Sequence, residues 1–161
     1  MIQKENACCF TGHRILSATM RENLGEKLEQ MLLILTEQGI TDFICGGARG
    51  FDTLAAQMVL EIREDMPQVR LILALPCREQ AKLWNEKEHA EWEAILRQAD
   101  EVIYTAEEYS TGCMMQRNRF MVDNSDICVY YLTNMRSGTC KTVQYALEQE
   151  KNLINILEEI K

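Results

Sequence analysis

"DFICGGARGFDTLAAQ", residues 42–57, joins a short apolar run to three glycines within five positions and then to a pattern of small and apolar residues. The apolar run predicts a strand, and the pattern after the glycines predicts a helix. Glycine lets backbone N–H groups approach an anion closely, and the start of the helix adds its positive dipole end. The stretch therefore fits a phosphate-binding turn, and equally a tight turn that forms for steric reasons alone.

Short apolar runs and helical patterns alternate along the rest of the chain. Continuous apolar runs predict six strands, as expected for a sheet covered on both faces, and helical periodicity predicts five helices. The expected strands are residues 7–11, 42–45, 69–75, 101–104, 127–132 and 153–157, and the expected helices are residues 20–38, 53–65, 79–98, 114–124 and 139–151. Thr19 and Glu22 fit a capping box at the start of the first helix.

This alternation predicts an α/β fold, a doubly wound, mainly parallel sheet of about six strands with helices on both faces, in a single domain over residues 1–161. In such sheets, ligands bind beyond the carboxyl ends of the strands, near the point where the strand order reverses. The residues that directly follow each expected strand are therefore the candidates for a binding site.

Composition excludes several classes of protein. The net charge of −8 disfavours binding of nucleic acid through a broad basic surface. No apolar run approaches the ~18 residues of a membrane span, and residues 1–10 lack the layout of a signal peptide. The seven cysteines form no C-x-x-C pair, which favours buried thiols in a reducing cytoplasm and no metal site. We expect a cytoplasmic protein without a membrane partner.

Polar residues gather after the first two expected strands. The candidates here are Thr11, Gly12, His13 and Arg14 after the first strand, and Gly46, Gly47, Ala48, Arg49, Gly50 and Asp52 after the second. Arg14 can donate two hydrogen bonds to a phosphate, or it can pair with a carboxylate on the surface. Asp52 can contact a ligand or cap the helix that begins near Thr53.

Two later segments add further candidates. Arg117 and Asn118 interrupt an apolar helical pattern, where they face either a pocket or solvent. Ser137, Gly138 and Thr139 form a second glycine-bearing turn into a helix, and Ser137 or Thr139 can cap that helix. The dinucleotide fingerprint and the P-loop are both absent, because Cys45 and Cys140 stand where these motifs need glycine.

Assembled in order, these segments resemble the YpsA-like family of the SLOG superfamily, whose members have a Rossmann-like fold. The resemblance extends roughly from residue 8 to residue 157 and rests on "TGHR", "GGARGFDTLAA", "P…EQ…W", "RN…MVDNSD" and "SGT". It implies a bacterial protein that binds a nucleotide or an NAD-derived ligand in the crevice between the glycine turns, and some members are linked to cell division. The superfamily also includes DNA-processing protein A.

The LONELY GUY phosphoribohydrolases of the same superfamily cleave the N-glycosidic bond of nucleoside monophosphates. Their motifs are M-x-x-R-K and P-G-G-x-G-T-x-x-E, and this chain matches them at Met114, Arg117, Gly138 and Thr139. It departs from them at Asn134, Met135 and Arg136, which replace P-G-G, and at Thr142, which replaces the catalytic glutamate. Threonine has no carboxylate for this reaction, so Arg117 is the matching catalytic candidate if the chain is an enzyme, with Asp52 or Asp123 as a substitute carboxylate.

The leading hypothesis is a cytoplasmic protein that binds a nucleotide or an ADP-ribose-like ligand and acts as a sensor or regulator. The glycine turns and the arginines would hold phosphate, while Asp52 and Asn118 would bind ribose or base. The alternative is an N-glycosidase, and single-stranded DNA binding fits the acidic chain least. No cofactor is implied beyond the nucleotide ligand itself. The apolar helix over residues 20–38 could pack on the sheet or on a second copy of the chain.

Overall fold

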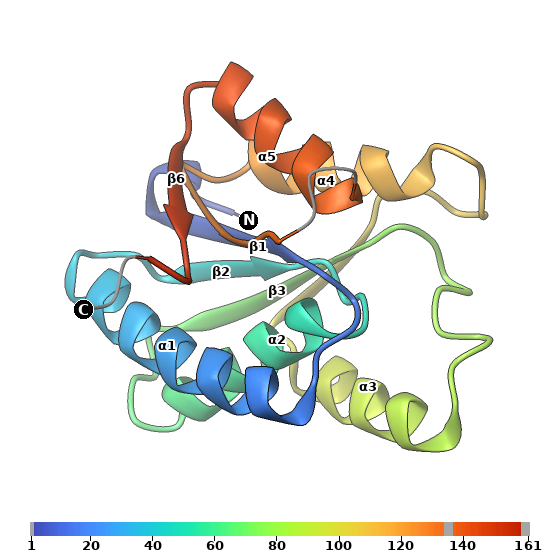
Figure 1. The fold of residues 1–161 in the computed structure, drawn as a ribbon, viewed down its shortest axis with the longest axis horizontal. Helices are drawn as coiled ribbons and strands as arrows, with labels where there is room; N and C mark the ends of the chain where they lie inside the picture. Colours follow the sequence, from blue (N-terminus) through green and yellow to red (C-terminus); the bar gives the residue numbers. More distant parts are fainter. Residues whose placement is uncertain (1, 134–136, 159–161) are drawn as a thin grey trace.

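The computed structural model describes residues 2–133 and 137–158, which form a six-stranded parallel sheet between two layers of helices (Figure 1). Along the sheet the strands follow the order β4-β3-β2-β1-β5-β6, and every pair of neighbours is parallel. Their bounds are Ala7–Gly12 for β1, Asp42–Cys45 for β2, Arg70–Leu75 for β3, Glu101–Tyr104 for β4, Ile127–Tyr131 for β5 and Asn152–Asn155 for β6. The predicted α/β, doubly wound fold is confirmed.

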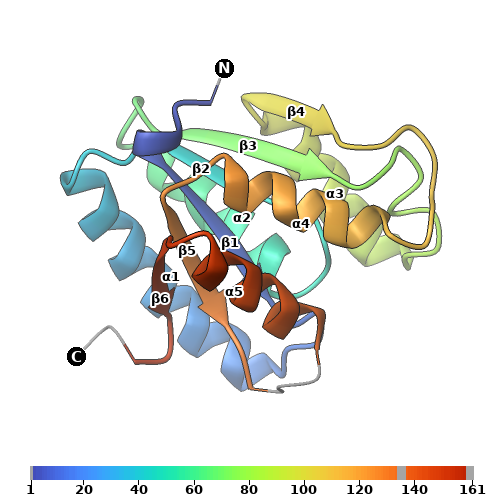
Figure 2. The ribbon, with the colours of Figure 1, turned by 90° about the horizontal axis from the view of Figure 1, so that it is seen from above.

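The helices cover both faces of the sheet. Three lie on one face, α1 (Ala18–Glu37), α2 (Phe51–Arg63) and α3 (Glu86–Gln98), and two lie on the other, α4 (Cys113–Asp123) and α5 (Gly138–Glu148) (Figures 1 and 2). A short 3₁₀ helix, η1 (Lys4–Asn6), precedes β1. None of the helices in the described ranges combines the length and the apolar character that crossing a bilayer would require.

The apolar core consists of two layers, one on each side of the sheet, because successive strand residues point to opposite faces. Phe10 and Phe43 lie in the larger layer beneath α1, α2 and α3, whereas Cys9 and Ile44 lie in the smaller layer beneath α4 and α5. The apolar stripe of α1 is buried within the chain and is not left free for a second copy. All seven cysteines are buried and unbridged, as predicted.

The starts of two helices differ from the sequence prediction. The capping box at Thr19 and Glu22 is wrong, because α1 begins at Ala18 and Ser17 Oγ accepts the N–H of Met20 at 3.1 Å. The third helix begins at Glu86 rather than at residue 79, since Asn85 caps it: Asn85 Oδ1 accepts the N–H of Glu88 at 2.8 Å. The segment before this cap forms turns instead.

The strand order reverses between β1 and β5. From β1 the chain adds β2, β3 and β4 in one direction, and α4 then carries it back across the other face to β5, on the opposite side of β1. Helix α1 follows β1 on one face and helix α5 follows β5 on the other, so a crevice is expected between them at the carboxyl edge of the sheet. The site must be sought at this edge.

Candidate functional site

A pocket of about 480 Å³ lies at the reversal point, between the loop after β1 and the first turns of α2, α4 and α5. We call it the switch-point pocket. Of the fifteen residues predicted from the sequence, eleven line it: Thr11, Gly12, His13, Arg14, Ala48, Asp52, Arg117, Asn118, Ser137, Gly138 and Thr139. Residues that are far apart in the sequence thus meet in one cavity, because the carboxyl ends of parallel strands share an edge.

Arg117 lies at the base of the pocket and is almost fully buried. Its Nη1 donates to the carbonyl oxygens of Gly46 and, at 3.4 Å, of Ala74, and its Nε donates to Asn118 Oδ1 at 2.8 Å. Burial lowers the pKa of Arg117, an effect that the charge of Asp52 opposes. The guanidinium thus joins the ends of β2 and β3 to α4 and places a positive charge under the pocket.

Asp52 is the single carboxylate among the described residues that line the switch-point pocket. The residue is 6% exposed, and Oδ2 accepts the N–H of Ala48 at 3.4 Å, whereas Oδ1 has no hydrogen-bond partner among the described residues. Burial raises the pKa of Asp52 from 3.8 to about 6, although the charge of Arg117 opposes this rise. Asp52 is not the helix cap, since α2 begins at Phe51 with Gly50 in the cap position. A buried acceptor without a donor calls for a partner, and the described residues do not supply one.

Gly46, Gly47 and Gly50 do not line the pocket, and the glycine turn serves close packing instead. A Cβ on Gly46 would lie 2.8 Å from both the Arg117 guanidinium and Asp52 Oδ2. Gly50 has a φ of 76°, and a Cβ there would lie 2.3 Å from the carbonyl oxygen of Arg14. The turn after β2 therefore presses against the loop after β1 and sets the position of Arg14.

Two cationic side chains, those of Arg14 and Lys141, line the switch-point pocket without a partner among the described residues. The side chains of Arg14 and Lys141 make no hydrogen bond or ion pair with the described residues, which therefore show no carboxylate partner for Arg14. Lys141 was missed by the sequence analysis, although it lies one turn beyond Ser137 on α5, and helical spacing alone places both on one face. Ser137 caps α5 as predicted, with Oγ accepting the N–H of Cys140 at 3.2 Å, so the positive end of this helix points at the pocket.

His13 has a structural contact at the rim. Its Nε2 accepts the N–H of Thr133 at 2.7 Å, and its ring packs edge-on against Tyr131 at 5.3 Å between centroids. Burial lowers the pKa of His13. A neutral imidazole therefore ties the loop after β1 to the end of β5.

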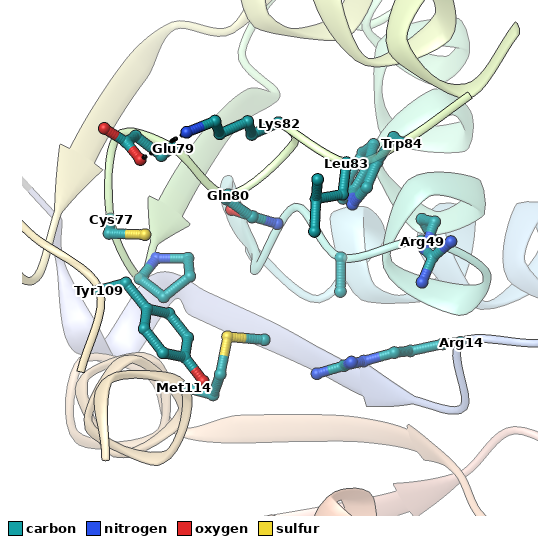
Figure 3. Close-up of a pocket in the computed structure, with 12 residues that line it drawn as sticks. Arg14, Arg49, Cys77, Glu79, Gln80, Lys82, Leu83, Trp84, Tyr109 and Met114 are labelled. Carbon is teal, nitrogen blue, oxygen red and sulfur yellow. Dashed lines mark ion pairs between the residues drawn. The ribbon is translucent and has the colours of Figure 1, made fainter. Parts of the chain in front are cut away.

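A second pocket of about 480 Å³ adjoins the first (Figure 3). We call it the side pocket. It shares Arg14, Ala48 and Met114 with the switch-point pocket and extends toward the turns that precede α3. Arg49 lines the side pocket, pairs with Glu88 at 3.6 Å and lies over the ring of Trp84. In Figure 3 the Arg14 side chain runs from the end of β1 toward Met114, at the junction of the two cavities.

The position of the phosphoribohydrolase glutamate lies outside both cavities. Thr142 is buried, and its hydroxyl donates to the carbonyl oxygen of Gly138 at 3.1 Å, within α5. Asn134, Met135 and Arg136, which replace P-G-G, lie outside the described residues. Over the described ranges, no group of three or more His, Cys, Asp or Glu side chains is placed to hold a metal ion.

Comparison with known proteins gives one family and two kinds of relative. The YpsA family model, described as "YspA SLOG family", matches residues 9–157. The SPbeta prophage-derived protein YoqJ of Bacillus subtilis is 32% identical over 74% of this chain and 80% of its own length, and the UPF0398 protein YpsA of the same organism is 29% identical over 77% and 70%.

Solved structures of DNA processing protein A share the fold. The Helicobacter pylori protein, described as binding single-stranded DNA, aligns with a TM-score of 0.67 and 19% identity over 94% of this chain, and the Streptococcus pneumoniae protein with 0.66 and 15% over 92%. This chain spans 64% of the first of these structures and 49% of the second.

Proposed function

The chain belongs to the YpsA SLOG family, and on that premise we propose that it is a cytoplasmic protein that binds a nucleotide or an ADP-ribose-like ligand in the switch-point pocket, as a sensor or regulator. One observation carries the proposal: Asp52, whose buried Oδ1 has no donor among the described residues, and Arg14, whose guanidinium has no partner among them, line the same pocket. An acceptor beside a cation suits a ligand that has both hydroxyl donors and an anionic group.

A nucleotide meets both requirements. Its phosphate would lie between Arg14, Lys141 and the start of α5, where two cations and a helix dipole favour negative charge. A ribose hydroxyl would donate to Asp52 Oδ1. The amide nitrogen of Asn118 stays available to a ligand acceptor, because its Oδ1 already accepts from Arg117.

Replacement of Arg14 tests this binding mode. We expect Arg14→Ala to weaken the affinity for AMP or ADP-ribose at least about tenfold, because a charge-assisted phosphate contact is lost. Isothermal titration calorimetry measures the effect, and Arg97→Ala, on the far part of α3, is the matched control. Failure of the unchanged protein to bind any nucleotide at millimolar concentration would refute the proposal.

The N-glycosidase alternative now depends on Asp52. Thr142 offers no carboxylate, and Asp123 lies at the end of α4 with its Oδ1 accepting the hydroxyl of Tyr145 at 2.7 Å. Asp52, with a pKa near the working range of a general acid or base, is the group in the pocket that could fill this role. Release of ribose 5-phosphate from nucleoside monophosphates in the same titration samples would distinguish turnover from binding.

We expect no binding of single-stranded DNA at physiological salt, in contrast to the function described for the Helicobacter pylori structure. The net charge is −8, and some arginines are already paired with carboxylates, such as Arg78 with Glu107 at 3.1 Å and Arg49 with Glu88 at 3.6 Å. Such a surface offers few cations to replace the counterions of a DNA strand. Fluorescence anisotropy with labelled oligothymidine checks this at low and physiological salt. Tight binding at both salt concentrations would contradict the prediction and show that the net negative charge does not prevent DNA binding.

A further inference from the structure

The side pocket has two apolar walls that face each other. Figure 3 shows Tyr109 and Met114 on one side and Trp84 with Leu83 on the other. Tyr109 is 75% exposed and Leu83 is 93% exposed, so both walls keep apolar surface in contact with water. Trp84 is held in place by an edge-on contact with Trp92 at 5.8 Å. A flat aromatic ligand group between these walls would bury that surface.

Gln80 lies between the walls, at the back of the side pocket (Figure 3). Its Nε2 donates to the carbonyl oxygen of Gly47 at 2.6 Å. This bond fixes which end of the amide is nitrogen, because a carbonyl oxygen accepts only from a donor. Gln80 Oε1 is buried and has no hydrogen-bond partner. Gln80, which lines the pocket, therefore has an acceptor oxygen whose orientation is set by the bond to Gly47 and which has no donor among the described residues.

From this geometry we infer that the side pocket receives the base of the nucleotide, and that Gln80 selects a 6-aminopurine by accepting a hydrogen bond from its exocyclic amino group. The inference rests on the proposed function and names the ligand class within it. Arg14 lies where the two pockets meet, so one nucleotide would place its phosphate in the switch-point pocket and its base in the side pocket. A purine fits the facing walls better than a pyrimidine, because it offers a larger stacking surface.

Three probes separate the base from the phosphate: AMP, purine riboside 5′-monophosphate, which lacks only the amino group, and ribose 5-phosphate, which lacks the base. We expect the unchanged protein to bind AMP about tenfold more tightly than the deamino analogue, since the analogue leaves the acceptor unpaired. Gln80→Leu should bind AMP and the deamino analogue with nearly equal affinity. Tyr109→Ala should weaken the affinity for AMP about tenfold, because stacking on the base is lost, and should leave the affinity for ribose 5-phosphate unchanged.

A second variant is needed because Gln80→Leu could lose binding simply by failing to fold. Gln80→Leu also removes the bond to Gly47, so its melting temperature without ligand is measured, whereas Tyr109 is exposed and its replacement leaves the core intact. Equal affinity of the unchanged protein for AMP and the deamino analogue overturns the inference and leaves the proposed function standing. Tighter binding of ribose 5-phosphate than of AMP also overturns it. If none of the three probes binds, the inference is overturned, and the proposed function fails as well if ADP-ribose and the other nucleotides also do not bind.

Discussion

Asp52→Asn should stabilise the protein above pH 6 and at the same time weaken nucleotide binding. Burial raises the pKa of Asp52 from 3.8 to about 6, so the ionised carboxylate is less stable in the folded protein than in the unfolded chain. By linkage this difference corresponds to about 3 kcal/mol of unfolding free energy above pH 6. A neutral amide of similar shape removes this penalty. Urea unfolding at several pH values measures the gain.

The sign of the pH dependence follows from the raised pKa. The folded protein binds this proton more tightly than the unfolded chain, so the unfavourable contribution is absent below pH 3.8 and fully present above about pH 6. The advantage of Asp52→Asn should therefore grow across that interval and then level off. Asp65→Asn, at an exposed position of the same charge, is the control and should leave the unfolding free energy nearly unchanged. A less stable Asp52→Asn protein at pH 7 would contradict the prediction.

Ligand affinity should move in the opposite direction. Ionised Asp52 accepts a charge-assisted hydrogen bond from a ribose hydroxyl, which is roughly twice as strong as a neutral one. We therefore expect Asp52→Asn to bind AMP about tenfold more weakly at pH 7. Affinity of the unchanged protein should also fall as the pH is lowered through about 6, and the variant should keep only the weaker dependence that comes from the phosphate group of AMP, which titrates in the same range. A stabilising change that lowers affinity is the behaviour expected of a binding residue rather than of a packing residue.

Positions of the site residues could be predicted because the fold is parallel. Short apolar runs before Thr11, Gly46 and Ser137 place all three segments at one edge of the sheet, whatever the details of the helices. The pocket could therefore be assembled from strand ends alone. Lys141 also follows from helical spacing once the start of α5 is known.

Other features depend on long-range contacts and could not be predicted. Asp52 Oδ1 and Gln80 Oε1 lack a hydrogen-bond donor among the described residues, and this can be recognised only from the three-dimensional structure. The third helix begins at Glu86 and not at residue 79 because Asn85 caps it, and the segment before the cap forms turns. In this segment Gln80 donates a hydrogen bond to the carbonyl oxygen of Gly47, which lies far from it in the sequence. The glycine turn had both a phosphate-binding and a steric explanation, and only the contacts of Gly46 and Gly50 distinguish them.

The steric role of the turn leads to a second large effect, at Gly50. We expect Gly50→Ala to lower the free energy of unfolding by about 3 kcal/mol or more. Its φ of 76° and ψ of −121° are strained for an alanine, and the added Cβ would lie 2.3 Å from the carbonyl oxygen of Arg14, a backbone atom that cannot turn aside. Phe51 also donates its N–H to the carbonyl oxygen of His13 at 3.1 Å, so relief of the clash breaks this bond. Chemical denaturation measures the loss.

Two other glycines separate the strain from the clash. Gly39 has a φ of 97° with open space around it, so Gly39→Ala reports backbone strain alone and should cost about 1 kcal/mol. Gly25 lies within α1, where a Cβ meets only Leu54 at 3.9 Å, so Gly25→Ala should stabilise the protein by roughly 0.5–1 kcal/mol. If Gly50→Ala costs no more than Gly39→Ala, the loops after β1 and β2 are not in close contact. Arg14 would then lack the support that directs it into the pocket, because the contact at Gly50 is what sets its position.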